Sequence, residues 1–65
     1  MNIVINKTPH ELPAGATLAD AVVLVKAVPP FAAAVNLQFV PNTRYAQTPL
    51  HSDDHVEIIR PVTGG

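Results

Sequence analysis

Residues 14–30 read AGATLADAVVLVKAVPP, and this stretch decides the fold because it contains the one helix that the sequence predicts. Thr17 is a good helix N-cap, and Asp20 follows in a capping-box-like position three residues later. Proline cannot continue a helix, so Pro29 and Pro30 are expected to end it. The apolar residues that share one helical face, at spacings of three and four, are Leu18, Ala21, Val22, Val25 and Val28.

Two short strands are predicted before this helix. NIVIN, at residues 2–6, alternates in the way that is typical of a half-buried strand. The segment NKTP, at residues 6–9, favours a turn because asparagine tolerates unusual backbone angles and proline fixes its own φ. HEL, at residues 10–12, is then expected to return as the second arm of a hairpin.

Three further strands are predicted after the helix. FAAAVNLQFV, at residues 31–40, reads as a strand, a turn at Asn36 and a short return strand. PNTRYAQTPL, at residues 41–50, predicts a loop with one helical turn, and HSDD, at residues 51–54, predicts a tight turn. HVEIIRPV, at residues 55–62, alternates and is expected to be the last strand.

This order of elements indicates the α+β class, and one helix covers only one face of a sheet. The open face receives Val4 and Ile59, which we expect on adjacent strands as an apolar patch for a partner. The side chains predicted to point toward the helix are Ile3, Ile5, Leu12, Leu18, Val22, Val25, Val35, Leu50, Val56 and Ile58.

The composition excludes several classes of function. A domain of 65 residues has no room for a deep cleft beside its core, so we predict a protein that is not an enzyme and has no catalytic residue. The net charge of −1 and the absence of a basic patch argue against nucleic-acid binding. The absence of cysteine fits a reducing cytoplasm. The longest apolar run, residues 21–25, is far short of the roughly 20 residues that cross a membrane.

Residues 51–55, HSDDH, place two histidines around two acids, as some metal sites do. Structural zinc usually requires four convergent ligands, and the chain has one more histidine, the distant His10. We therefore interpret the segment as a solvated turn and predict no metal and no bound cofactor.

The chain closes on VTGG, residues 62–65, which we predict to be a flexible tail after a folded domain of residues 1–61. Without a Cβ, Gly64 and Gly65 fit a channel that is too narrow for other residues, and they leave the terminal carboxylate open to attack. A carboxylate is a poor acyl donor, so a second enzyme must activate it, most simply as an acyl-adenylate formed from ATP. An inert terminus is the alternative interpretation.

Four segments point to a known family: MNIVIN, AGATLAD, AAAVNLQFVPNTRYAQ and LHSDDHVEIIRPVTGG. Together they make the chain resemble, over its full length, the small sulfur-carrier proteins of thiamine biosynthesis, the ThiS family. The resemblance implies a ubiquitin-like β-grasp fold, with a mixed sheet of four to five strands, one helix packed on one face and a flexible C-terminal tail.

The resemblance also implies a mechanism. An adenylyltransferase of the ubiquitin-activating class (ThiF type) would adenylate the carboxylate of Gly65, and sulfur from a persulfide donor would convert it to a thiocarboxylate. A thiazole synthase (ThiG type) would receive the sulfur, while ATP and the donor would belong to the partner enzymes. Gly64 and Thr63 would give access to the tail, and we expect the carrier to be a monomer. The predicted partner-binding surface is Val4, Ile59, Arg60 and Val62.

Three other functions fit the same residues. The small subunit of molybdopterin synthase has this fold and tail with a different acceptor, although those chains are usually longer. A ubiquitin-like modifier would join its tail to lysines of other proteins. A binding module with an inert tail would keep its function without Gly65.

Two positions depart from the family pattern. The family usually has glycine in the turn before the last strand, where this chain has Asp53, and aspartate is expected to adopt left-handed angles at a small cost. Family members often have arginine directly after the proline of the VP pair, where this chain has Asn42, with Arg44 two residues later.

Overall fold

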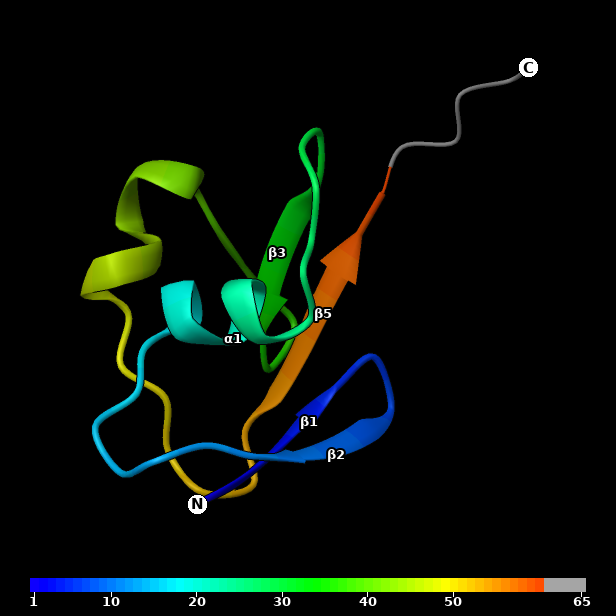
Figure 1. Cartoon of the computed structure of the whole chain (residues 1–65). Helices are drawn as coiled ribbons and strands as arrows, with labels where there is room; N and C mark the ends of the chain where they lie inside the picture. The colour runs from blue at the N-terminus through cyan, green and yellow to red at the C-terminus, as the bar shows by residue number, and fades with distance from the viewer. Residues whose placement is uncertain (61–65) are drawn as a thin grey trace.

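A computed structural model describes residues 1–60 of the chain; residues 61–65 lie outside the described part. The described chain begins at the lower end of Figure 1, and its last strand runs toward the upper right. The elements, in chain order, are β1 (Asn2–Ile5), β2 (Thr8–Glu11), α1 (Leu18–Leu24), β3 (Ala32–Val35), β4 (Gln38–Val40), the 3-10 helix η1 (Asn42–Gln47) and β5 (His55–Ile59).

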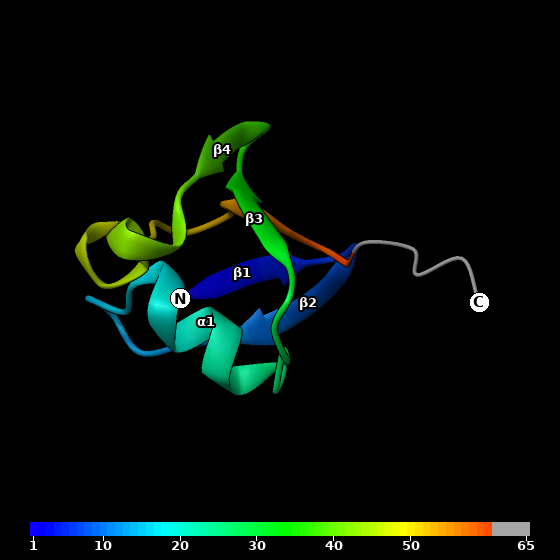
Figure 2. The same ribbon diagram turned by 90° about the horizontal axis from the view of Figure 1, so that it is seen from above.

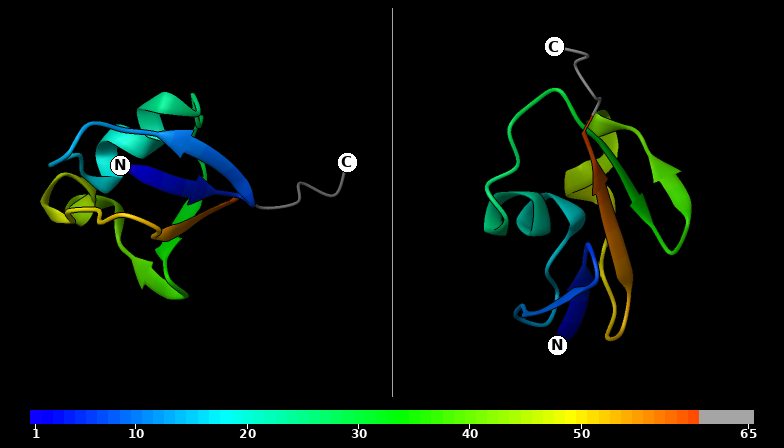
Figure 3. Two further views of the ribbon diagram at one scale, coloured as in Figure 1. Left: turned by 90° about the horizontal axis from the view of Figure 1, so that it is seen from below. Right: turned by 90° about the vertical axis from the view of Figure 1, so that its right-hand side faces the viewer.

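The strands form one mixed sheet in the order β2-β1-β5-β3-β4, which Figure 3 (left) shows from below. β1 and β5 lie side by side and run parallel, whereas the other neighbouring pairs are antiparallel. The last strand of the sequence therefore lies in the middle of the sheet, between β1 and β3. The predicted mixed sheet with one α-helix is confirmed.

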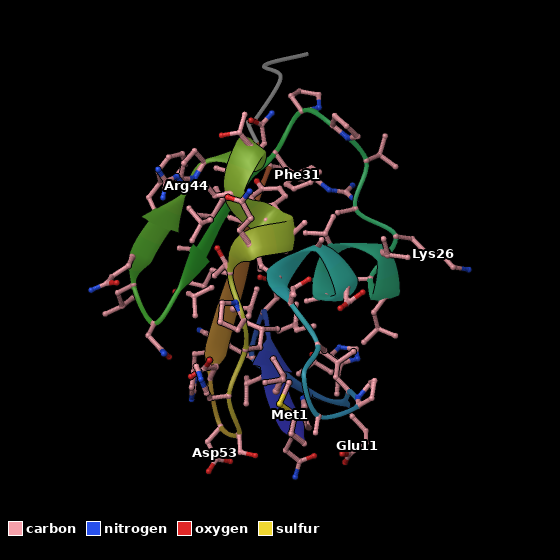
Figure 4. All side chains as sticks on the ribbon, turned by 90° about the vertical axis from the view of Figure 1, so that its left-hand side faces the viewer. Met1, Glu11, Lys26, Phe31, Arg44 and Asp53 are labelled. Atoms are coloured by element: carbon pink, nitrogen blue, oxygen red, sulfur yellow. The ribbon has the colours of Figure 1, made fainter. Side chains whose placement is uncertain are left out.

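Both helices lie on the same side of this sheet, as Figure 2 shows from above and Figure 4 shows from the helix side. The main chain joins them, because the N–H of Leu18 donates to the carbonyl of Thr48 at 2.9 Å and the N–H of Leu50 donates to the carbonyl of Ala16 at 3.0 Å. We call this side the covered face. The other side, turned toward the viewer in Figure 3 (right), is the open face, and no helix lies in front of β5 there.

The hydrophobic core lies between the helices and the covered face. Six of the ten predicted inward residues are fully buried, whereas Val25, Val35 and Ile58 pack partly buried against the core and Val22 is half-buried. Three alanines complete the core. The buried set is Ile3, Ile5, Leu12, Ala16, Leu18, Ala21, Ala33, Leu50 and Val56.

The start of α1 matches the sequence prediction. The N–H of Thr17 donates to the carboxylate of Asp20 at 2.8 Å, and the two residues form a capping box. The acidic side chain also lies in the first turn, where it complements the helix dipole.

The end of α1 corrects the prediction, because the helix stops at Leu24 and does not continue to the prolines. Lys26 adopts φ +54°, its N–H donates to the carbonyl of Val23, and the N–H of Ala27 donates to the carbonyl of Val22. This is a Schellman cap with lysine in the place that glycine usually takes. Val28 therefore lies beyond the helix and is exposed, not on its inner face.

Two hairpins with the same kind of two-residue turn, β1–β2 and β3–β4, flank β5. Each turns through two residues with positive φ, Asn6 and Lys7 in the first and Asn36 and Leu37 in the second. Two central residues with φ > 0 match the twist of the strands, and asparagine tolerates such angles. The turn predicted at Asn36 is confirmed.

The second strand begins earlier than predicted, at Thr8 instead of His10, and it ends at Glu11. The two-residue turn brings the chain back at once, so Pro9 pairs with Val4 inside the strand. β2 is an edge strand, where a residue without an N–H is tolerated.

β5 ends at Ile59, three residues before the predicted end, and Arg60 follows it outside regular structure. The turn before β5 contains Asp53 at φ +71°, which confirms that aspartate adopts the left-handed angle at this place. The predicted helical turn after Pro41 is confirmed as η1. Among residues 1–60, no helix is long and apolar enough to cross a membrane.

Candidate functional site

The predicted sulfur-carrying end of the chain follows β5. Gly65, Gly64, Thr63 and Val62 all lie outside the described residues, so their predicted roles remain predictions. Arg60 is the last described residue and is exposed. The described structure therefore shows β5 and Arg60, which directly precede the predicted tail.

The start of β5 is fixed by a polar network around Asp54. Its carboxylate accepts hydrogen bonds from the side-chain amide of Asn36 at 3.0 Å and from the main-chain N–H of His51 at 2.8 Å. The amide oxygen of Asn36 also accepts the N–H of His55 at 2.9 Å. The network joins the β3–β4 turn to the first residue of β5.

These contacts change the acidity of Asp54. Partial burial raises the pKa of the Asp54 carboxyl, but the hydrogen bonds from Asn36 and His51, together with the charge of protonated His51, outweigh it. The pKa therefore lies below its ordinary value of 3.8. The predicted interpretation of HSDDH as a turn agrees with this geometry. Within residues 1–60, no three histidine or acidic side chains gather closely enough to hold a metal ion.

The open face carries apolar side chains that no described element covers. Cross-strand partners share a face, and the register pairs Ala34 with Phe39 and Ala32 with Ile59. Phe39 is 68% exposed and Ile59 is 53% exposed. We call Ala32, Ala34, Phe39 and Ile59 the open-face patch. One charged residue, Glu57, lies beside it as the other cross-strand partner of Ala34.

Val4 and Ile59 lie on adjacent strands, as predicted, but they are too far apart to form one patch. β1 and β5 are adjacent, but Val4 lies level with His55, four residues along β5 from Ile59. At about 3.3 Å per residue, this separates the two by about 13 Å along the strand. The neighbour of Ile59 is Ala32 on the other side of β5.

Val4 instead lines a shallow hollow in the sheet, with a volume of about 320 Å³. The hollow is mixed in character, because its walls include a cation, a carboxylate, an amide and an imidazole as well as two valines. Its lining residues are Val4, Asn6, Lys7, His55, Val56 and Glu57.

Sequence reasoning missed Phe39 as a surface residue, although a signal was present. A two-residue turn at Asn36 and Leu37 forces Ala34 to pair with Phe39. Since Ala33 is buried, its neighbour Ala34 points away from the core, and Phe39 must do the same.

Comparison with known proteins shows the family of the chain. The model of the ThiS family matches residues 3–65. The chain belongs to the ThiS family. Members of this ThiS family are small ubiquitin-like carrier proteins rather than enzymes, and the predicted family is confirmed.

Two solved structures share the fold of this ThiS-family chain. A crystal structure of the thiamine biosynthesis protein ThiS from Geobacter metallireducens aligns with a TM-score of 0.82 at 17% identity and covers 100% of both chains. A solution NMR structure of a thiamine biosynthesis protein from Geobacter metallireducens aligns with a TM-score of 0.78, also at 17% identity, and covers 100% of this chain and 88% of the other. No curated protein sequence matches the chain.

Proposed function

We propose that this ThiS-family protein carries sulfur on the C-terminal carboxylate of Gly65 and delivers it for formation of the thiazole ring of thiamine. The observation that carries the proposal is the family match, which extends through the final diglycine. The sheet agrees with it, because β5, the strand that leads toward that diglycine, lies in the middle of the sheet and is held on both sides.

The chemistry requires three partner-catalysed steps to form the thiocarboxylate and a fourth to deliver the sulfur. A ThiF-type adenylyltransferase joins a carboxylate oxygen of Gly65 to the α-phosphorus of ATP, and pyrophosphate leaves. A persulfide sulfur attacks the acyl carbon, and AMP leaves with the electron pair of the broken C–O bond. A second thiol then cleaves the S–S bond of this acyl persulfide, which leaves the thiocarboxylate on Gly65 and a disulfide on the donor. A ThiG-type thiazole synthase accepts the sulfur.

The open-face patch is the proposed docking surface for the adenylyltransferase. Phe39 and Ile59 offer exposed apolar area, and aromatic anchors of this kind contribute strongly to binding at protein interfaces. Ile59 directly precedes Arg60, so docking here also holds the origin of the tail. We keep Arg60 and Val62 in the proposed surface, with Val4 at its far end.

The choice of thiamine over molybdopterin is supported by the two similar solved structures, because both are described as thiamine biosynthesis proteins. We further propose that the carrier acts in the cytoplasm, since a chain without cysteine suits a reducing compartment. We also propose that it acts as a monomer.

Growth without thiamine tests this function. The chain, expressed together with the adenylyltransferase from its own genome, is expected to restore growth to a bacterial strain that lacks its own sulfur carrier for thiazole. Deletion of Gly65 should abolish rescue completely, because the reacting carboxyl group would then be displaced by one residue.

Three results would point to an alternative function. A strain that lacks the small subunit of molybdopterin synthase should not be rescued, and rescue there would move the proposal to that pathway. Rescue of the thiamine strain by the Gly65-deleted protein would contradict the carrier function. Recovery of the chain covalently joined to larger proteins would indicate a modifier.

A further inference from the structure

The side chain of Asn6 extends the sheet at the end of β5 that leads to the tail. The register between β1 and β5 ends at Ile5 and Val56, because the main chain turns away at Asn6 with φ +50°. The N–H of Asn6 still donates to the carbonyl of Val56 at 2.9 Å. Its side-chain oxygen then accepts the N–H of Ile58, also at 2.9 Å.

This side-chain bond replaces a missing main-chain bond. The N–H groups of Val4 and Asn6 donate to Asp54 and Val56 in turn, which is the even spacing of a parallel ladder. The next bond in such a ladder runs from the N–H of Ile58 to the main chain of the neighbouring strand. Because β1 has ended, the amide oxygen of Asn6 accepts that N–H instead.

The other asparagine turn provides an internal comparison. Asn36 has nearly the same φ, +49°, and its amide oxygen accepts the N–H of His55 at 2.9 Å. Asn36 therefore binds the first residue of β5, whereas Asn6 binds Ile58, two residues before Arg60. The same chemistry holds the two ends of one strand.

We propose that Asn6 is a positioning residue for the C-terminal tail: its bond to Ile58 fixes the direction of the last residues of β5, so that the tail starts toward the partner's reaction centre from a fixed point. The inference rests on the proposed carrier function. β3 pairs with β5 as far as Ile59 on one side, and within residues 1–60 the Asn6 amide supports the strand on the other side.

Positioning of this kind affects turnover more than binding. Rate depends steeply on the placement of reacting groups, and a shift of about 1 Å from a remote change can reduce it about a hundredfold. Docking through the open-face patch uses other side chains, so the affinity for the partner should be little changed.

Three variants test the proposal in an assay of pyrophosphate release by the ThiF-type adenylyltransferase. Asn6→Gly keeps the left-handed turn but removes the acceptor for Ile58. Asn6→Asp keeps both the turn and an acceptor oxygen. Asn36→Gly is the control at the far end of β5, where it removes the equivalent bond to His55 together with the bond to Asp54.

We expect Asn6→Gly to lower kcat about tenfold while the KM for the carrier changes less than about twofold. Asn6→Asp should stay within about threefold of the wild-type kcat, and Asn36→Gly within about twofold. A wild-type kcat for Asn6→Gly, or an equal loss in Asn36→Gly, would overturn the proposal and leave Asn6 with a purely structural role.

Amide hydrogen exchange in the wild-type protein keeps the test valid even where a variant does not fold. The Ile58 N–H should exchange about as slowly as the His55 N–H, because both donate to an asparagine oxygen, and free exchange at Ile58 would contradict the proposal. The Gly65-deleted protein belongs in the same assay. Release of pyrophosphate from ATP with that protein as the substrate would refute the carrier function itself, independently of the result for Asn6.

Discussion

The two faces of the sheet differ in what they do with apolar side chains. On the covered face, Ile3, Ile5 and Val56 are almost completely excluded from water beneath the helices. On the open face, Phe39 of β4 and Ile59 of β5 remain more than half exposed, although β5 also carries the buried Val56. Burial on one face is sufficient to hold the small domain together, so the exposed residues on the other face are available for a partner.

A substitution on the covered face should have the largest effect on stability. Leu18→Ala removes a fully buried side chain, and we expect the free energy of unfolding to fall by about 3 kcal/mol. Val23→Ala on the exposed side of the same helix is the control, with an expected change within about 0.5 kcal/mol. Denaturant titrations measure both, and similar losses would mean that the two sides of the helix are not distinct.

Substitutions on the open face should affect binding and leave folding intact. We expect Phe39→Asp and Ile59→Asp each to weaken binding to the adenylyltransferase at least about tenfold, or about 1.4 kcal/mol, because a charge replaces an apolar contact. Unfolding free energies should change by less than about 0.5 kcal/mol.

Leu37→Asp is the matched control for the open face. Leu37 is 86% exposed at a turn with φ +70°, outside the open-face patch, and aspartate tolerates that angle. Its affinity in the same titration should equal that of the wild type. Unchanged affinity for Phe39→Asp and Ile59→Asp would remove the patch from the docking surface.

The C-terminal cap of α1, on the covered face, should have a smaller effect on stability and none on binding. Lys26→Gly relieves the left-handed angle of a residue with a Cβ, and we expect the unfolding free energy to rise by about 0.5–1 kcal/mol without a change in affinity. Ala27→Gly, at the next position, should lower stability. Thermal or denaturant unfolding measures both variants. A Lys26→Gly protein less stable than the wild type would contradict the assignment of Lys26 to a left-handed cap.

The smallest effect is expected at the start of β5, where Asp54 binds Asn36 and His51. Its lowered pKa stabilises the folded state fully above about pH 4, and this contribution is lost as the pH falls through the folded-state pKa. Asp54→Asn should therefore show a weaker loss of stability between about pH 4 and about pH 2 than the wild type. Identical acid dependence of the two proteins in denaturant titrations would contradict the assignment.

The sequence predicted most of the covered face because its signals are local and regular. The capping residues Thr17 and Asp20, the alternation in β1 and the turn at Asn36 each report directly on backbone angles. The end of α1 was not predictable in the same way, since Lys26 is not a residue that usually occupies a left-handed cap. Val25 and Val28, beyond the end of α1 at Leu24, continue a helical pattern that the chain does not follow.

The candidate site was predicted less completely, because it depends on the register between distant strands. Val4 and Ile59 were correctly assigned to the open face, but their separation along β5 follows from pairings that local patterns do not contain. Phe39 was missed for the same reason. The bond from Ile58 to Asn6 joins residues 52 positions apart, and no local pattern indicates it.

The most direct test of the account is the intact mass of the protein after incubation with ATP, its ThiF-type adenylyltransferase and a persulfide donor. The account predicts a mass increase equal to the replacement of one oxygen by sulfur, located at Gly65 by fragmentation. Phe39→Asp should reach the same product more slowly. An unchanged mass, with the adenylyltransferase shown to be active on another carrier, would contradict the proposal that this chain carries sulfur.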